Sequence, residues 1–199
     1  SAASDVYKRQ SLLFPERVNS RLVVLAPGKK RPRTAPKLRN VLYLTPIGRS
    51  GALAWVEYTP DGHYTIVAED SLRQRTAWPM PGFSEVHGLA WDNATERLYT
   101  LVTDDSGMWF GRIDGDGVHP VTEGAYITLS NLRAGGGRLY FGSIASGRDE
   151  AHCFDLKTRR EYRITTSAYG SFMPVPWRDG EGRERVLLTA YDRGGYHVA

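Results

Sequence analysis

The chain has 199 residues, a net charge of +4 at pH 7 and one cysteine, Cys153. A single cysteine excludes an internal disulfide, and no apolar run approaches the ~20 residues of a membrane span. Most of the positive charge lies in residues 11–40, which carry a net charge of +7, whereas residues 1–10 carry +1 and the residues from Val41 onward carry 16 basic and 20 acidic groups. We therefore expect no nucleic-acid partner, and we interpret the basic stretch as a protected strand edge.

Residues 1–10, SAASDVYKRQ, match the in-frame translation of a sequencing adapter, so we expect this segment to be non-native. On this interpretation the true start of the protein is missing, and nothing follows about a signal peptide. Residues 11–37 come next as an incomplete unit. One strand is expected at Arg21–Ala26, and a proline-broken edge strand is expected at residues 29–37.

Residues 38–80 form the first complete unit of the predicted fold. Four strands are expected in it, at Leu38–Leu44, Ala52–Tyr58, Tyr64–Glu69 and Arg75–Trp78. The turn at residues 59–62, Thr-Pro-Asp-Gly, joins the second strand to the third.

Residues 83–123 contain the clearest unit. Its expected strands are Glu85–Trp91, Arg97–Thr103, Met108–Ile113 and Val118–Thr122. Turns rich in Asp, Asn and Gly separate them, which is typical of an antiparallel meander. The second strand is apolar at successive positions instead of alternating, and this pattern predicts a sheet covered on both faces.

Residues 125–167 make a third complete unit, and residues 169–199 make a partial one that we expect to be cut short. An apolar anchor recurs every 43 residues, at Leu89, Leu132 and Val175. An aromatic residue stands six positions before each anchor, at Phe83, Tyr126 and Tyr169. A period of about 40 to 45 residues with four strands per copy is typical of a β-propeller blade. We expect an all-β fold, an incomplete propeller with three complete and two partial blades.

The sequence shows no catalytic or metal-binding motif: HExxH, GxSxG and GxxxxGK[ST] are all missing from it. The run at residues 114–117, Asp-Gly-Asp-Gly, partly resembles a calcium loop. Arg112 stands where the first carboxylate ligand belongs, so a hairpin turn is expected instead. His152 and Cys153 are adjacent on an expected strand and point to opposite faces, so they cannot bind one metal together. We expect no cofactor, no metal and no catalytic residue.

Two sets of propeller loops gather on one face: those joining the second strand to the third, and those joining one blade to the next. Recognition residues are concentrated in such loops. We expect the binding residues to be Asp61, His63, Glu85, His87, Asp104, Asp105, Tyr126, Asp149, Tyr169 and Asp192. Arg148 and Arg193 lie in the same loops without being counted among them. The alternative is that the acidic residues cap turns and the aromatic residues pack between blades.

Three stretches resemble the WD40-like repeats of TolB-type propellers: residues 53–70 (LAWVEYTPDGHYTIVAED), residues 97–122 (RLYTLVTDDSGMWFGRIDGDGVHPVT) and residues 154–167 (FDLKTRREYRITTS). The last of these fits the repeat best. The resemblance implies a bacterial envelope or secreted protein, periplasmic in the TolB manner, that binds a protein or peptide partner without catalysing a reaction. The alternative it leaves open is the substrate-gating propeller of a larger hydrolase, similar to the prolyl oligopeptidases.

Overall fold

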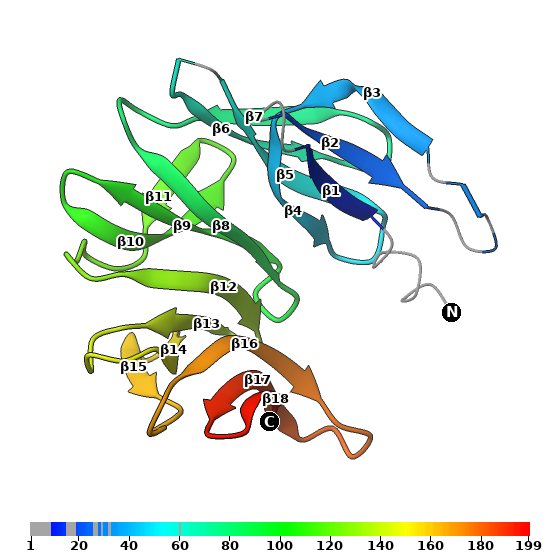
Figure 1. Cartoon of the computed structure of the whole chain (residues 1–199). Coiled ribbons are helices and arrows are strands. Elements are labelled where there is room, and N and C mark those ends of the chain that lie inside the picture. The colour runs from blue at the N-terminus through cyan, green and yellow to red at the C-terminus, as the bar shows by residue number, and fades with distance from the viewer. Residues whose placement is uncertain (1–8, 15–18, 26–27, 29, 32, 60) are drawn as a thin grey trace. The chain divides into compact units, whose positions relative to one another are not determined.

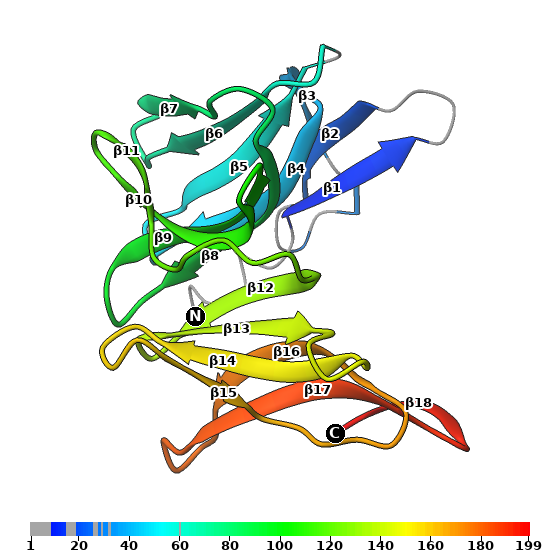
Figure 2. The same ribbon diagram turned by 90° about the vertical axis from the view of Figure 1, so that its left-hand side faces the viewer.

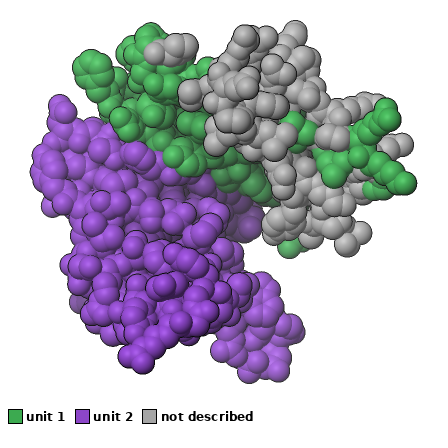
Figure 3. Space-filling view, in the orientation of Figure 1, with its two compact units in different colours: residues 1–86 green, residues 87–199 purple. Residues whose placement is uncertain are grey.

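A computed structural model describes residues 9–14, 19–25, 28, 30–31, 33–59 and 61–199. The chain divides into two compact units, residues 1–86 and residues 87–199 (Figure 3). The described residues form strands, turns and connecting segments, with no helix among them (Figure 1). Accordingly, this described part of the chain contains no helix of the length and apolarity that crossing a membrane demands.

The first unit holds two antiparallel meanders. The three-stranded sheet consists of β1 (Arg9–Phe14), β2 (Asn19–Val24) and β3 (Arg33–Arg39). The four-stranded sheet consists of β4 (Val41–Ile47), β5 (Ala52–Tyr58), β6 (Tyr64–Glu69) and β7 (Arg75–Pro79). The predicted bounds of β5 and β6 are therefore confirmed at both ends.

The start of this unit differs from the expectation in its strand bounds. β1 begins at Arg9, so the last two residues of the adapter-like segment pair with β2, while residues 1–8 lie outside the described part of the chain. The non-native origin of that segment stays a prediction. Leu38 belongs to β3, and the next sheet begins at Val41. The chain turns between them at Asn40, whose φ of 56° is one that asparagine tolerates better than most residues.

The second unit holds three antiparallel meanders. The first contains β8 (Glu85–Asp92), which begins in the last two residues of the first unit, β9 (Arg97–Asp104), β10 (Gly107–Asp114) and β11 (Gly117–Pro120). The second contains β12 (Leu129–Gly135), β13 (Arg138–Ser143), β14 (Glu150–Asp155) and β15 (Arg160–Arg163). The third contains β16 (Ser171–Arg178), β17 (Glu184–Asp192) and β18 (Gly195–Val198).

The core of the second unit lies between its first two sheets. Leu101 and Phe110 of the first sheet belong to one buried cluster with Leu139 and Phe141 of the second. The rings of Phe110 and Phe141 are 4.7 Å apart and tilted, an arrangement that aromatic pairs prefer. The opposite face of the second sheet packs against β16, and Figure 2 shows β13 and β14 layered beside β16 and β17. A sheet covered on both faces explains why its central strands are apolar at successive positions.

Three of the first strands carry a β-bulge near their start. Two residues on the bulged strand face one on its partner between Leu42 and Thr45, between Ser130 and Arg133, and between Phe172 and Val175. The first residue inside each bulge has a positive φ: 51° at Tyr43, 55° at Asn131 and 54° at Met173. Bulges bend a strand and increase its twist. The recurrence marks the same structural position in three sheets.

The bulges correct the register of the predicted anchors. Leu132 is the second residue of its bulge and is 1% exposed, and the residue at the same place in β16 is Pro174, which is buried. Val175, the predicted anchor, lies one residue further on and is 40% exposed. The second step of the repeat, from Leu132 to Pro174, is therefore 42 residues, because Pro174 takes the anchor position.

Replacing Leu132 by alanine should lower the free energy of unfolding by about 2–5 kcal/mol, because it empties a site in the core. The matched variant Val175→Ala should cost less than about 1 kcal/mol, because that side chain is already partly in solvent. Urea unfolding followed by tryptophan fluorescence measures both. Equal losses would contradict the assignment of the anchor position to Pro174.

Candidate functional site

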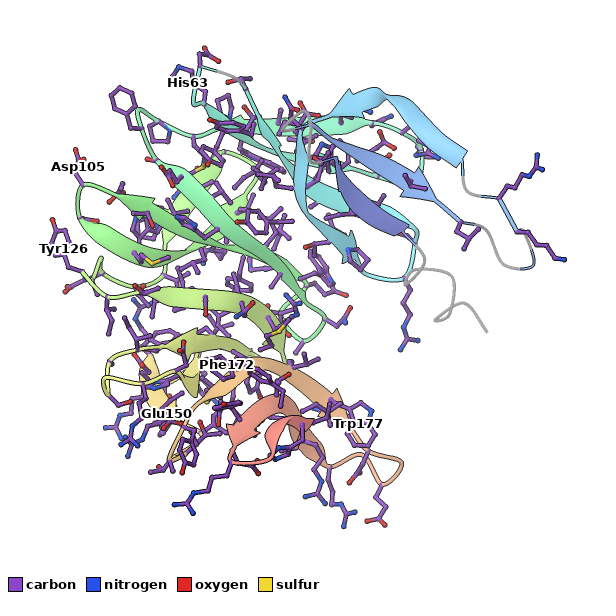
Figure 4. The ribbon with its side chains drawn as sticks, viewed as in Figure 1. His63, Asp105, Tyr126, Glu150, Phe172 and Trp177 are labelled. Atoms are coloured by element: carbon purple, nitrogen blue, oxygen red, sulfur yellow. The ribbon has the colours of Figure 1, made fainter. Side chains whose placement is uncertain are left out.

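In the second unit the loop between β9 and β10 lies against the segment that leads into β12. Met108 and Ala125 exchange two backbone hydrogen bonds, with N···O distances of 2.8 and 3.0 Å. The hydroxyl of Tyr126 donates to the backbone carbonyl of Asp105. Figure 4 shows Asp105 and Tyr126 at the same edge of the unit. The structure thus brings two of the predicted binding residues together.

Two glycines make this contact possible. Gly107 has a φ of 102°, and a Cβ atom there would meet the backbone of Ala125. A Cβ atom on Gly124 would in turn meet the side chain and backbone of Ser106. Larger residues at either position would force the two segments apart. The loop and the segment therefore pack backbone to backbone.

Asp104 plays a structural part in the same loop. One carboxylate oxygen accepts from the backbone N–H and the hydroxyl of Ser106, at 2.8 and 2.6 Å, and the other accepts from the indole N–H of Trp109 at 2.8 Å. The hydrogen bond from the Ser106 hydroxyl is the main reason why the pKa of Asp104 lies below its ordinary value. The carboxylate of Asp104 therefore caps its own turn, as the alternative interpretation of the acidic residues proposed.

The same arrangement recurs at the next sheet. The guanidinium Nη1 of Arg148 donates to the carbonyl of Ala168 at 2.9 Å, and the N–H of Ser171 donates to the carbonyl of Asp149 at 2.8 Å. The loop between β13 and β14 therefore holds the segment that leads into β16. Asp149 contributes its backbone to this contact.

The turn between β17 and β18 reaches the same segment through Arg193. Arg193 donates from Nε to the hydroxyl oxygen of Tyr169 at 3.1 Å. The carboxylate of Asp192 accepts from the N–H of Gly194 at 2.7 Å and lies 3.6 Å from Nδ1 of His197. Asp192 thus caps its turn while remaining exposed.

Buried polar groups fix the path toward Tyr169. Glu150 is 2% exposed, and its carboxylate accepts from the hydroxyl of Thr165 and from the N–H of Ser167, the latter at 2.9 Å. The hydroxyl of Ser167 accepts from the N–H of Gly170 at 2.8 Å. A buried carboxylate with its hydrogen bonds made restrains the loop that presents the tyrosine.

The N–H of Ile144 donates to the carbonyl of Thr128 at 3.4 Å, which links the loop between β13 and β14 to the segment that leads into β12. With this link, the loop contacts described above form one continuous row. We define the loop surface of the second unit as residues 104–107, 123–128, 144–149, 166–170 and 192–195. Tyr126 is 88% exposed and Tyr169 is 47% exposed within it. The alternative in which the aromatic residues pack between blades therefore does not hold for Tyr126, because its side chain is largely exposed.

The remaining predicted residues lie elsewhere. Asp61 and His63 are exposed in the first unit, with 3.7 Å between Oδ2 of Asp61 and Nε2 of His63, and a hydrogen bond from Thr59 lowers the pKa of Asp61. Glu85 lies in the same unit, where its charge adds to the effect of burial in raising the pKa of Tyr43. His87 begins the second unit and is partly buried in β8. That these residues share a face with the loop surface stays a prediction.

The described residues contain no group of three His, Cys, Asp or Glu side chains with the geometry of a metal site. The Asp-Gly-Asp-Gly run is the hairpin turn between β10 and β11, as expected, with Asp114 paired across it to Gly117. The carboxylate of Asp114 is occupied by Arg97 and Arg112. Sequence reasoning missed the roles of Arg148 and Arg193. The available signal was their position in the loops between second and third strands.

Comparison with solved structures identifies the fold. TolB from Acinetobacter baumannii matches with a TM-score of 0.70 and 14% identity, over 96% of this chain and 51% of that one. A putative TolB from Agrobacterium tumefaciens matches with a TM-score of 0.58 and 18% identity, over 90% of this chain and 72% of that one. A structure from a study of two prolyl endopeptidases matches with a TM-score of 0.53 and 13% identity, over 90% of this chain and 30% of that one.

The chain is an all-β protein with the fold of an incomplete β-propeller built from four-stranded antiparallel sheets. Among solved propellers it is similar to TolB, and it spans about half the length of the A. baumannii protein. No family model matches the sequence, and a search of curated proteins finds no match. At these identities the comparisons establish the fold, and the function is argued below from the loop surface.

Replacing Asp104 by alanine should lower the free energy of unfolding by about 1–2 kcal/mol, because two donors of the turn and the indole lose their acceptor. Asp105→Ala should stay within about 0.5 kcal/mol, because the side chain of Asp105 is exposed and its backbone carbonyl is retained. Chemical unfolding of both variants at neutral pH provides the measurement.

The loss in Asp104→Ala should also depend on pH. A carboxyl group whose pKa is lowered by folding stabilises the folded state above its ordinary pKa of 3.8, and this contribution disappears as the pH falls through the lower, folded value. The stability difference between wild type and Asp104→Ala should therefore narrow below pH 3.8. A difference that stays constant in this range would show that the lowered pKa contributes nothing.

Proposed function

We propose that the chain is a non-catalytic binding module, a segment of a TolB-like propeller whose loop surface receives a protein or peptide partner. The observation that carries the proposal is the continuous row of loop contacts in the second unit. The row joins three consecutive sheets and presents the exposed side chains of Tyr126 and Tyr169. A restrained surface of this kind loses little conformational entropy when a partner binds.

The chemistry of the loop surface suits a polypeptide. Tyrosine side chains combine a large apolar ring with a hydroxyl, and they are enriched at protein interfaces for that reason. The backbone at Asp105 and Ala168 is held in place by hydrogen bonds from Tyr126 and Arg148. An extended partner can therefore meet a preformed series of aromatic and polar positions in the order of the sheets.

The proposed location is the bacterial envelope or the periplasm. Two of the similar solved structures are TolB proteins, and the sequence resembles TolB-type repeats in three stretches. The partner would accordingly be another protein or peptide of that compartment, or further parts of a longer chain to which this segment belongs.

Tyr126→Ser should weaken peptide binding at least about tenfold, because it removes an exposed aromatic contact at the surface. The probe is a dodecapeptide selected from a random displayed library on the 199-residue chain, resynthesised and titrated by isothermal calorimetry. The matched control is Leu72→Ser, which removes another exposed apolar side chain, 77% exposed, from the turn between β6 and β7 of the first unit.

Melting temperatures of the two variants should stay close to that of wild type, which separates binding from stability. Selected peptides that bind Tyr126→Ser as tightly as wild type would show that the loop surface is not the binding site. A library that yields no specific peptide at all would contradict a peptide-binding module.

The similarity to prolyl endopeptidase structures favours one alternative, a substrate-gating propeller of a larger hydrolase. In that case the catalytic serine lies outside residues 1–199. Sequencing the same reading frame in its genomic context discriminates the two proposals. A downstream α/β-hydrolase segment with GxSxG supports the gating function, and its absence from the complete reading frame contradicts it.

A further inference from the structure

Two arginines donate hydrogen bonds to the segment that carries the exposed Tyr169. Arg148 comes from the loop between β13 and β14 and donates to the carbonyl of Ala168 at 2.9 Å. Arg193 comes from the turn between β17 and β18 and donates to the hydroxyl oxygen of Tyr169 at 3.1 Å. Because Ala168 and Tyr169 are consecutive, both guanidinium groups are attached to the same short segment.

Both guanidinium groups keep most of their hydrogen-bonding capacity. An arginine has five N–H donors, and within the part of the chain that the structure describes Arg148 and Arg193 each make the single hydrogen bond just given. Neither lies within ion-pair distance of a described carboxylate, in contrast to Arg178 and Arg183 of the same unit, which pair with Glu184 and Asp179 respectively. Among the described residues, neither of the two positive charges therefore has an ion-pair partner.

Tyr169 supplies a third donor at the same place. Its hydroxyl oxygen accepts from Arg193, so its own O–H proton is available to an acceptor outside. The ring is 47% exposed and meets the ring of Tyr191 edge-on, with centroids 6.2 Å apart. The site thus combines two guanidinium groups and a hydroxyl donor with an apolar aromatic surface.

The choice of a carboxylate follows from the proposed partner. Asp149 and Asp192 lie in the same two loops as the arginines, one beside each in sequence. Attraction to the arginines and repulsion from these aspartates both scale with the charge of the anion, so charge alone does not select between a carboxylate and a phosphate. An unmodified peptide carries its negative charge on carboxylates, and planar guanidinium groups match the two oxygens of a carboxylate geometrically.

We infer that the Tyr169 position of the loop surface binds a peptide carboxylate, with Arg148 and Arg193 as its cationic donors and an apolar side chain of the peptide against the tyrosine rings. The carboxylate belongs either to the C-terminus of the peptide or to an internal Glu or Asp. This inference rests on the proposed function and specifies the chemistry of the partner at one position.

The test uses the 199-residue chain and three synthetic peptides in an NMR titration of backbone amide and arginine Nε–H signals. The first is N-acetyl-Ala-Ala-Ala-Ala-Phe with a free carboxylate, the second is the same peptide as the carboxamide, and the third is N-acetyl-Ala-Ala-Glu-Ala-Phe-amide. Binding of the first alone identifies a C-terminal carboxylate, and binding of the first and third identifies carboxylates generally. In both cases the signals of Tyr169 and Arg193 should shift.

Arg193→Gln and Arg148→Gln should each weaken binding of the free-acid peptide about tenfold, because each removes charge-assisted donors. Tyr169→Phe, which keeps the ring and removes the O–H, should weaken it less. The matched control is Arg160→Gln on β15, an exposed arginine that carries the same charge change outside the loop surface. It should leave binding nearly unchanged.

Three results would overturn the inference. They are equal affinity for the acid and carboxamide peptides, an effect of Arg160→Gln as large as that of Arg193→Gln, and tighter competition by inorganic phosphate than by acetate. If the acid and carboxamide peptides bind equally while Tyr126→Ser still weakens the binding of library-selected peptides, the carboxylate site is refuted and the proposed binding function is retained. If neither the synthetic nor the library-selected peptides bind the wild-type chain, both proposals are refuted.

Discussion

The packing of one antiparallel sheet on the next is the constraint on which the loop surface depends. In the second unit the contact is close enough that a Cβ atom on Gly88 of β8 would lie 3.2 Å from the Cβ of Leu132 on β12. The hydroxyl of Thr100 donates to the carbonyl of Gly88 at 3.0 Å, which satisfies a backbone acceptor where the sheets meet. Dry, close packing of this kind has few alternative arrangements. This packing therefore fixes the spacing between successive sheets and between the loops that they carry.

A threonine two residues beyond the fourth strand repeats in two of the sheets, where the chain leaves the strand for the loop surface. The hydroxyls of Thr122 and Thr165, 43 residues apart, accept from the backbone N–H of Phe110 and Ala151 at 3.0 and 2.9 Å. At both places two successive backbone N–H groups converge on one carbonyl of the third strand. The regular ladder ends there, because a side-chain oxygen replaces a backbone acceptor. The segments that follow carry Tyr126 and Tyr169 to the neighbouring loops.

Local sequence signals were sufficient for much of the fold. The second and third strands were predictable because Asp- and Gly-rich hairpin turns fix both their ends, and β5 and β6 have the expected bounds. The first strands were harder, because a bulge inserts a residue without any change in composition. Val175 was mistaken for an anchor for that reason, since the apolar pattern alone cannot locate the extra residue.

The candidate site was predictable in its residues and not in its contacts. Tyr126 and Asp105 were both expected in loops, but their hydrogen bond joins positions 21 residues apart and depends on how two segments pack. In the sequence, Asp104 cannot be distinguished from Asp105 as a candidate binding residue. Only the hydrogen bonds that its carboxylate accepts from Ser106 and Trp109 show that it stabilises the turn. Arginines in loops usually extend into solvent, so the positions of Arg148 and Arg193 carried no sequence signal beyond their location.

The loop surface is electrostatically asymmetric, and this asymmetry has a consequence for recognition. Around Tyr126 the neighbouring charged side chains are the exposed carboxylates of Asp105 and Glu123. Around Tyr169 they are Arg148 and Arg193, which have no ion-pair partner among the described residues, together with Asp149 and Asp192. Charged positions at an interface fix register and orientation more than they raise affinity. If the loop surface receives a peptide as proposed, the carboxylates near Tyr126 and the two arginines near Tyr169 favour one orientation of that peptide, with its carboxylate at Tyr169 and any cationic group toward Tyr126.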